Sequence, residues 1–469
     1  MRKADSLLII MMFCFSHGYA TIVHVPTEVL TIQAGIDTAT TGDTVLVQPG
    51  TYTENINFNG KNITLHSTGG PEVTIIDGNQ TGSCVFIASG ENENAVMDGF
   101  TLTNGTGSFS GIAYVGGGIA VINNSSPTLT NLIVTGNSST IGSAPSGGGI
   151  NIGVNSTPYL EGILVTNNTS VWGGGISIYD CSPVMQNVVI SNNHATTAGG
   201  ALYIGVNAAP EIRSVEISDN TAESFAAGIF VSDNSSPLLN EVTVVGNRCP
   251  AYGGGLTIID NCNPVITNSI FWDNVPSQIY LYDSNVFFPS TLTVRYSDIL
   301  NGSGGIELEN GTLFWQEGNI DAAPWFCEPE ASIFTMAEDS PCLGTGENGV
   351  DMGAYGLGCT TPVALDDDPT LPEQLTLHQN YPNPFNPSTT INFDLPGAGW
   401  VKLVVYDVLG RQVATLLDAE QDAGYQSIFW NAMDEQGKSL EAGVYLYQLH
   451  YVNNNGSEFR SVKKFSLLK

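Results

Sequence analysis

Two aspartates are the side chains in this 469-residue sequence whose spacing best suits paired acid chemistry. Asp233 and Asp260 each stand four residues before a proline, and 27 residues separate them. If the chain stacks repeats of that length, the two carboxylates become neighbours. A pair of carboxylates can cleave a glycosidic bond, and carboxylate oxygens also bind Ca²⁺.

Aspartate at this position has a simpler explanation, because Asp and Asn form turns by bonding to their own backbone. Asn123 stands in the equivalent place of an earlier repeat. We therefore predict no catalytic residue and no cofactor. A Ca²⁺ ion held by Asp233 and Asp260 stays open as the alternative.

Basic side chains are scarce where a polysaccharide lyase would need them. Such an enzyme uses Lys or Arg as its base and further Arg to neutralise a uronate carboxylate. Residues 21–360 hold four Lys or Arg against 31 Asp or Glu, so the net charge is 4 − 31 = −27. The four basic residues are Lys61, Arg213, Arg248 and Arg295. This charge would repel a polyanionic substrate unless calcium intervened.

Two aromatic residues offer a binding surface instead. Tyr203 and Phe230 occupy the same row of successive repeats, and the aliphatic residues on either side of that row are predicted to face the core. The aromatic row should therefore face outward. Because exposed aromatic rings can bind the apolar faces of sugars, we predict that Tyr203 and Phe230 bind a glycan.

A repeat written six times between Gly116 and Asn274 must position these residues. Each copy opens with a step rich in Gly or Ala, a proline follows eight or nine residues later, and an asparagine follows ten residues after the proline. A fixed period of this size is typical of a solenoid. The asparagines are Asn137, Asn168, Asn193, Asn220, Asn247 and Asn274.

The apolar residues indicate which solenoid this is. After each Gly-rich step, apolar and variable residues alternate, as at Ile150 and Ile152, which predicts a strand with one buried face. Two further short strands follow the proline, and no helical stripe separates them. Three strands per repeat predict a parallel β-helix. The asparagine row should lie at corners, with left-handed backbone angles and with its amides bonded from coil to coil.

On these repeats, residues 21–360 resemble the right-handed parallel β-helix, or pectin-lyase-like, superfamily. A short helix that Thr27 caps and that carries Ile32 and Ile36 on one face is expected to cover the first coil. The segment from Asn319 to Cys359 resembles the closing module often found behind bacterial β-helices. The superfamily includes polysaccharide lyases, hydrolases and epimerases, so the resemblance implies the fold and leaves the activity open.

Three cysteines lie in the expected closing module, namely Cys327, Cys342 and Cys359. Export would allow one disulfide among them. The sequence does not decide which two pair. No Cys-x-x-Cys pair and no cluster of histidines suggests a zinc site.

Residues 1–20 have the pattern of an export signal, with a charged start at Arg2 and Lys3, an apolar run and small residues before a cleavage site. No later stretch reaches the ~18 apolar residues that span a membrane. The whole chain carries 45 acidic and 13 basic side chains, a net charge of −32. This charge argues against a nucleic-acid partner.

Residues 361–376 are polar and carry several prolines, which predicts a linker. Residues 377–469 contain short strands separated by turn signals, which predicts a small Ig-like β-sandwich. Its motifs, in order, are Asn380-Tyr381-Pro382-Asn383-Pro384-Phe385-Asn386-Pro387, Tyr406-Asp407-Val408-Leu409-Gly410-Arg411, Gly443-Val444-Tyr445-Leu446-Tyr447 and Lys463-Lys464-Phe465.

These motifs and their order resemble the C-terminal sorting domain of the type IX (Por) secretion system. The resemblance implies that the outer-membrane translocon of a Gram-negative bacterium is a partner. It also implies passage through the periplasm to an extracellular or cell-surface location.

The sequence therefore predicts an all-β chain, a right-handed parallel β-helix solenoid followed by a small Ig-like β-sandwich. Its predicted function is that of a secreted or cell-surface scaffold, adhesin-like or glycan-binding and non-catalytic. The alternative is a carbohydrate-active enzyme of the pectin-lyase-like superfamily, either a polysaccharide lyase or a glycoside hydrolase.

Overall fold

The computed structural model describes residues 20–110, 114–142, 145–282 and 289–360, and, towards the C-terminus, residues 375–380, 383, 385, 389–421, 423–434, 438, 440–453 and 458–467. Residues 1–19 of the predicted export signal and 361–374 of the predicted linker lie outside the described residues. The chain divides into two compact units, Met1–Thr361 and Pro362–Lys469. Each unit has an apolar core of its own.

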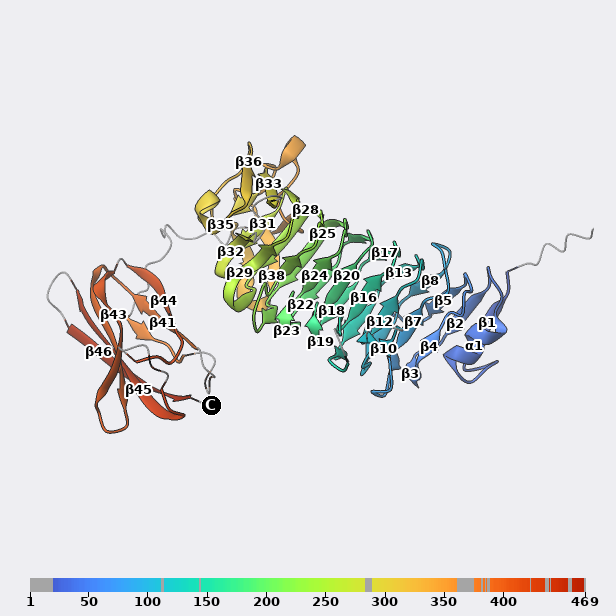
Figure 1. Cartoon of the computed structure of the whole chain (residues 1–469), viewed down its shortest axis with the longest axis horizontal. Helices are drawn as coiled ribbons and strands as arrows, with labels where there is room; N and C mark the ends of the chain where they lie inside the picture. The colour runs from blue at the N-terminus through green and yellow to red at the C-terminus, as the bar shows by residue number, and fades with distance from the viewer. Residues whose placement is uncertain are drawn as a thin grey trace, which may run out of the picture. The chain divides into compact units, whose positions relative to one another are not determined.

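The first unit is a solenoid of short parallel strands (Figure 1). Successive coils pair in register, so that Ile119 lies beside Ile150 and Ile150 beside Ile176. The stacking that the repeat predicts is therefore confirmed. Side chains at equivalent positions of successive coils form continuous rows along the solenoid.

The strands form four columns. The coils of the regular repeat pass through all four in turn, whereas the coils before Ser138 have no strand in column 4. Columns 1 and 2 make a 20-stranded sheet. Column 1 consists of β1 (Ile22–Val25), β2 (Thr44–Val47), β5 (Thr64–Ser67), β8 (Val96–Asp98), β13 (Thr128–Thr130), β17 (Tyr159–Glu161), β21 (Val184–Gln186), β30 (Val265–Thr267), β33 (Thr291–Arg295) and β36 (Thr312–Trp315). Column 2 consists of β3 (Gly50–Thr53), β6 (Thr74–Asp77), β9 (Thr101–Thr103), β14 (Ile133–Thr135), β18 (Leu164–Thr166), β22 (Val189–Ser191), β31 (Ile270–Trp272) and β34 (Asp298–Ile299). Two longer strands run through both columns, β25 (Glu211–Ser218) and β28 (Leu238–Val245).

Columns 3 and 4 make a 14-stranded sheet. Column 3 consists of β4 (Ile56–Asn57), β7 (Val85–Ile87), β12 (Ile119–Val121), β16 (Ile150–Gly153), β20 (Ile176–Tyr179), β24 (Leu202–Gly205), β27 (Ile229–Val231) and β35 (Ile306–Glu309). Column 4 consists of β15 (Ser138–Ser139), β19 (Thr169–Trp172), β23 (His194–Ala198) and β26 (Thr221–Ala222). Both columns are joined by β29 (Arg248–Ile258) and β32 (Val275–Tyr282). A small antiparallel pair, β10 (Ser108–Phe109) and β11 (Tyr114–Val115), lies beside them.

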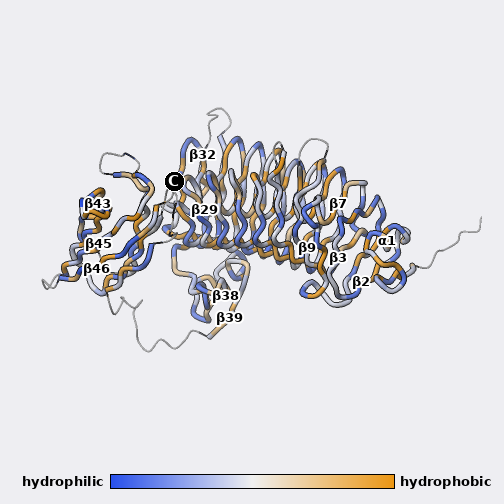
Figure 2. The backbone as a smooth tube through the Cα atoms, turned by 90° about the horizontal axis from the view of Figure 1, so that it is seen from below, coloured by the Kyte–Doolittle hydropathy of each residue, from blue (hydrophilic) through white to orange (hydrophobic). Residues whose placement is uncertain are grey.

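Column 4 was not predicted from the sequence, which indicated three strands per coil. It begins directly after each buried asparagine and ends before the Gly-rich step. Its residues carry no regular apolar alternation, so periodicity could not find it. The inner faces of the other columns hold the aliphatic rows of the core. Figure 2 shows apolar and polar stretches alternating along the chain.

The asparagine row forms the predicted ladder inside the solenoid. Each side-chain Nδ2 lies 2.9–3.1 Å from Oδ1 of the asparagine in the next coil, from Asn137 to Asn274. The ladder ends on Gln278, whose Oε1 accepts from Asn274 Nδ2 at 2.8 Å. Every rung is buried. Leaving one such buried amide unpaired would cost about 1–3 kcal/mol.

The prediction of left-handed angles at the asparagines themselves is wrong. The residue before each ladder asparagine has the positive φ instead, as at Asn192 (56°) and Gly246 (67°). This residue turns the chain into the coil corner, and the next side chain then points inward where the ladder forms. Small or turn-forming residues occupy the turning position because bulky side chains are strained there.

A helix covers the N-terminal end of the core, as predicted. It is α1 (Ile32–Thr38), and its residues Ile32 and Ile36 are fully buried. The helix starts later than predicted, because Thr31, not Thr27, caps it by accepting the N–H of Ala34 at 3.2 Å.

The closing module does not lie over the last coil. It comprises β37 (Phe326–Glu328), β38 (Ile333–Ala337) and β39 (Leu357–Cys359) with the short helical turns η2 (Pro329–Ala331) and η3 (Glu347–Gly349), and Figure 2 shows β38 and β39 beside the solenoid. Tyr355 Oη donates to Glu216 Oε2 at 2.7 Å, several coils back. The disulfide joins Cys327 to Cys359, whereas Cys342 is a buried thiol.

The second unit is a small β-sandwich. One sheet contains β40 (Thr376–Leu377), β41 (Thr389–Leu395) and β44 (Gly424–Trp430), and the other contains β42 (Gly399–Asp407), β43 (Gln412–Gln421), β45 (Gly443–Asn453) and β46 (Glu458–Leu467). Its core includes Tyr447 and Phe465, both fully buried. The predicted sandwich is therefore confirmed.

Candidate functional site

Asp233 and Asp260 occupy equivalent turns, which the sequence repeat predicts. Their φ angles are 56° and 57°, and the asparagine after each also has a positive φ. Asp233 Oδ2 accepts the hydroxyl of Ser232 at 2.7 Å. These features are those of turn-forming residues. Among the described residues, no three or more His, Cys, Asp or Glu side chains gather as metal ligands would.

Tyr203 and Phe230 are neighbours, but they do not form an exposed platform. Their ring centroids lie 5.9 Å apart with the planes 14° from parallel, so each ring covers a face of the other. Phe230 is only 4% exposed. The expectation that this row faces solvent is therefore wrong for Phe230. The reason is column 4, which brings the rings of Trp172 and Phe225 against Phe230.

The stacking continues along the solenoid. Phe225 stacks on Tyr252 with centroids 4.7 Å apart, and Tyr252 contacts Tyr280 at 5.1 Å. Rings that stack on one another leave mainly their edges for a ligand. We assign this aromatic corner chiefly to packing between coils.

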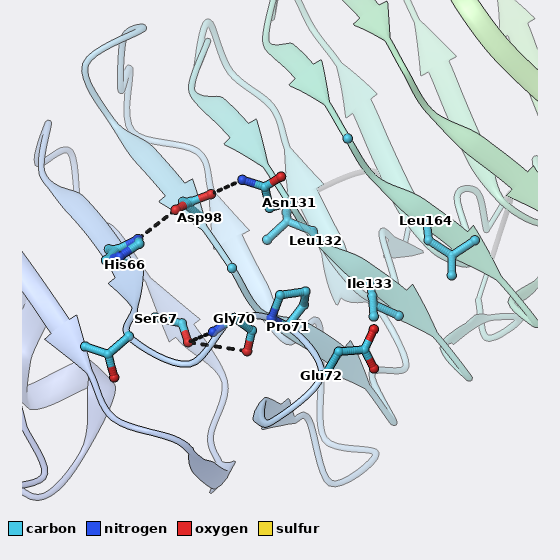
Figure 3. Close-up of a pocket in the computed structure, with 13 residues that line it drawn as sticks. His66, Ser67, Gly70, Pro71, Glu72, Asp98, Asn131, Leu132, Ile133 and Leu164 are labelled. Carbon is cyan, nitrogen blue, oxygen red and sulfur yellow. Dashed lines mark hydrogen bonds and ion pairs between the residues drawn. The ribbon is translucent and has the colours of Figure 1, made fainter. Parts of the chain in front are cut away.

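The structure shows a different hollow, between columns 1 and 2 in the early coils (Figure 3). We call it the groove. It has a volume of about 540 Å³ and is lined by His66, Ser67, Thr68, Gly70, Pro71, Glu72, Asp98, Gly99, Asn131, Leu132, Ile133, Gly162 and Leu164. These residues come from four successive coils, and none of them is Lys or Arg.

The corner between columns 1 and 2 gives the groove its shape. One residue per coil turns there with a positive φ, including Gly99 (87°), Asn131 (50°) and Gly162 (63°). One wall is the loop after β5, where Ser67 Oγ accepts the N–H groups of Gly69 at 3.2 Å and Gly70 at 3.1 Å. Short turning residues at the corner leave room for a ligand beside the strands.

A histidine and an aspartate form the polar wall of the groove. His66 in β5 and Asp98 in β8 are register partners, and Nδ1 of His66 lies 2.6 Å from Oδ2 of Asp98. Asp98 Oδ1 accepts from Thr130 Oγ1 at 2.9 Å and from Asn131 Nδ2 at 2.6 Å. Burial by itself would raise the pKa of Asp98, but the bonds from Asn131, Thr130 and His66 together lower it below its ordinary value.

The electrostatics fix the orientation of the imidazole. Because an ionised carboxylate only accepts hydrogen bonds, Nδ1 of His66 is the donor in its contact with Asp98. The His66 side chain is 42% exposed. Opposite the polar wall, Ile133 and Leu164 present half-buried aliphatic surface to the groove. The site thus pairs fixed polar groups with an apolar wall.

The sequence analysis missed this site because His66 and Asp98 lie outside the regular repeats. A signal was available. Each residue follows a buried apolar residue of a short strand, Leu65 or Met97, and aligning these two strands places His66 beside Asp98.

Family models match two parts of the chain. Residues 198–319 match the right handed beta helix region. The first unit is a right-handed β-helix. Residues 383–455 match the FlgD Ig-like domain, in agreement with the sandwich.

A search of curated proteins finds no match. No described helix of the β-helix unit or the sandwich is long and apolar enough to cross a membrane.

Solved structures resemble only parts of the chain. Latent PorU from Porphyromonas gingivalis is 24% identical over 20% of this chain and 9% of its own, with a TM-score of 0.17. PorZ, a surface component of the type IX secretion system of the same organism, is 17% identical over 24% and 13%, with a TM-score of 0.15. CopC from Methylosinus trichosporium OB3b is 11% identical over 20% and 93%, with a TM-score of 0.14. The matched region thus spans about a tenth of the PorU and PorZ chains.

Proposed function

We propose that this protein is an exported, non-catalytic scaffold whose β-helix binds an uncharged glycan in the groove. The observation that carries the proposal is the polar wall of His66 and Asp98 facing the aliphatic wall of Ile133 and Leu164. Sugars have hydroxyl groups on their rims and C–H groups on their faces. A site for them therefore needs fixed hydrogen-bonding groups next to apolar surface.

Charge favours an uncharged polysaccharide over a uronate. The groove holds Glu72 and Asp98 without a basic residue. Around it, residues 21–360 have the net charge 4 − 31 = −27. A polyanion would be repelled both at long range and within the site. A groove formed by four successive coils also suits an extended chain of sugars.

The experiment is a glycan array followed by titration of each hit. His66→Ala and Asp98→Leu remove the fixed polar wall and should weaken binding about tenfold or more, since each removes a hydrogen-bonding group. His194→Ala is the control, because this half-exposed histidine lies far along the coils in β23. Binding that survives both groove variants unchanged rules the groove out as the glycan site.

The same array tests the residues predicted from sequence. Tyr203→Ala with Phe230→Ala would lower affinity if the aromatic corner contributes to the site. Addition of a chelator would lower the affinity for the glycan if a Ca²⁺ ion at Asp233 and Asp260 takes part in binding. We propose the groove as the primary site because it is open, whereas the ring faces of Tyr203 and Phe230 cover each other.

A carbohydrate-active enzyme is the second candidate, and the His66–Asp98 pair is the observation that favours it. A carboxylate that orients an imidazole is a common arrangement for a general base. Release of reducing sugar or of unsaturated product from neutral polysaccharides, abolished in His66→Ala, would establish this alternative.

The second unit supports export through the type IX system. Its motif order resembles the sorting domain, and its fold is the predicted sandwich. Deletion of residues 377–469 in a host with that system should leave the protein in the periplasm. Secretion of the truncated chain would refute this part of the proposal.

A further inference from the structure

The last coil of the β-helix ends in an open core. In the preceding coil, Leu281 and Val294 point inward and are fully buried. Their register partners in the last coil are Leu308 in β35 and Trp315 in β36. These two residues share the inward direction but are 49% and 36% exposed. Nothing in the described part of the chain covers them as α1 covers the opposite end.

The edges of the same coil are open as well. Within the described residues, β35 pairs only with β32, and β36 pairs only with β33. Figure 1 shows both strands at the end of the solenoid opposite α1. An open strand edge beside apolar side chains is a template for a further strand. Solenoids otherwise cover such ends with a capping element.

The negative charge of this end indicates which kind of segment it would bind. Glu307, Glu309 and Glu317 are exposed around the apolar residues, and residues 306–318 contain no Lys or Arg. Glu309 accepts the hydroxyl of Tyr280 at 2.8 Å and so stays fixed at the rim. A second copy docking with the same end would bring like charges together, which disfavours a symmetric dimer. A cationic segment would be attracted.

We propose that the open end formed by β35 and β36 binds an extended segment of another protein in which apolar residues alternate with Lys or Arg. The segment adds as a strand to β35 or β36. Its apolar side chains cover Leu308 and Trp315, and its basic side chains reach Glu307, Glu309 and Glu317. The site is independent of the groove, which lies in earlier coils.

The test uses the full chain and two synthetic peptides, one alternating Lys with Val and one alternating Glu with Val. Titration calorimetry should show binding of the Lys peptide at least about tenfold tighter than of the Glu peptide, with the difference shrinking in high salt. Amide hydrogen exchange should slow at residues 306–309 and 312–315 when the Lys peptide is added.

Variants separate the two contributions. Leu308→Lys combined with Trp315→Lys should abolish binding, and Glu307→Gln combined with Glu317→Gln should weaken it about tenfold. Leu30→Lys is the control, because Leu30 is an exposed apolar residue close to α1 at the other end. Unchanged thermal unfolding shows that the variants remain folded.

Three results overturn the proposal. The first is equal or absent binding of the two peptides. The second is loss of binding in Leu30→Lys. The third is a dimer in sedimentation velocity that Trp315→Lys dissociates, since that would make a second copy the occupant.

Discussion

Asp298 is a carboxyl group enclosed between the β-helix and its closing module. Its Oδ2 accepts from Cys342 Sγ at 3.1 Å, and its Oδ1 accepts from the backbone N–H of Ala322 at 3.1 Å. Burial raises the pKa of Asp298 to about 6, and nearby Asp321 adds to the rise while the two hydrogen bonds oppose it. The protonated form is therefore the one that suits this interface.

The sign of the pH dependence follows from this raised pKa. Stability from the buried neutral carboxyl is fully present below the ordinary pKa of Asp and is lost as pH rises through about 6. The free energy of unfolding of the native chain, relative to Asp298→Asn, should fall by about 2 kcal/mol between pH ~4 and ~7.

Urea unfolding at several pH values measures this difference. Carboxyls with lowered pKa, such as Asp98, titrate in both proteins and cancel. Two curves that stay parallel across the range would contradict the role given to Asp298.

Among the elements, the Gly-rich steps set how closely columns 3 and 4 approach. A Cβ on Gly174 would lie 2.3 Å from the carbonyl oxygen of His194 and 2.5 Å from that of Gly200. Both are backbone atoms held by neighbouring coils, so neither can move aside cheaply. By contrast, a Cβ on Gly153 would meet nothing closer than 3.5 Å.

Gly174→Ala should therefore lower the free energy of unfolding by roughly 3 kcal/mol or more, as overpacking against fixed atoms does. Gly153→Ala, in the adjacent column 3 strand, should change it by less than about 1 kcal/mol. Chemical denaturation of the two variants side by side decides the matter. Equal losses of unfolding free energy in the two variants would mean that the Gly-rich steps are not where neighbouring coils pack most closely.

The strands, the asparagine ladder and the sandwich could be predicted because each depends on local alternation or on a repeated residue. Three features were not predicted. The burial of Phe230 depends on Trp172 from another coil, and the closing module packs against Glu216 more than a hundred residues before it. The groove depends on His66 and Asp98, which no repeat links. Contacts of this kind arise only when the coils are stacked.

At the scale of the whole molecule, the two units differ in net charge and have separate apolar cores. Residues 21–360 carry a net charge of 4 − 31 = −27, whereas residues 377–469 carry 7 − 9 = −2. The apolar cores of the described residues are also separate, and the two clusters share no residue. The two units therefore need not unfold together.

Differential scanning calorimetry tests this separation. Residues 20–360 and 375–469, expressed separately, should each unfold in one transition, and the trace of the full chain should be the sum of the two within about 2 °C. A shift of either transition by more than about 5 °C in the full chain would mean that the units stabilise each other.

Three successive repeats of 27 residues, bounded by Pro183, Pro210, Pro237 and Pro264, stack through the same asparagine rungs and aliphatic rows. The upper surface of one such repeat is thus interchangeable with that of the next. Duplicating one 27-residue repeat would lengthen the β-helix by one strand spacing, about 4.8 Å. The added repeat would make the same contacts with its neighbours as the existing repeats do. Selection can therefore adjust the length of the β-helix through the number of repeats, without changing either of its ends.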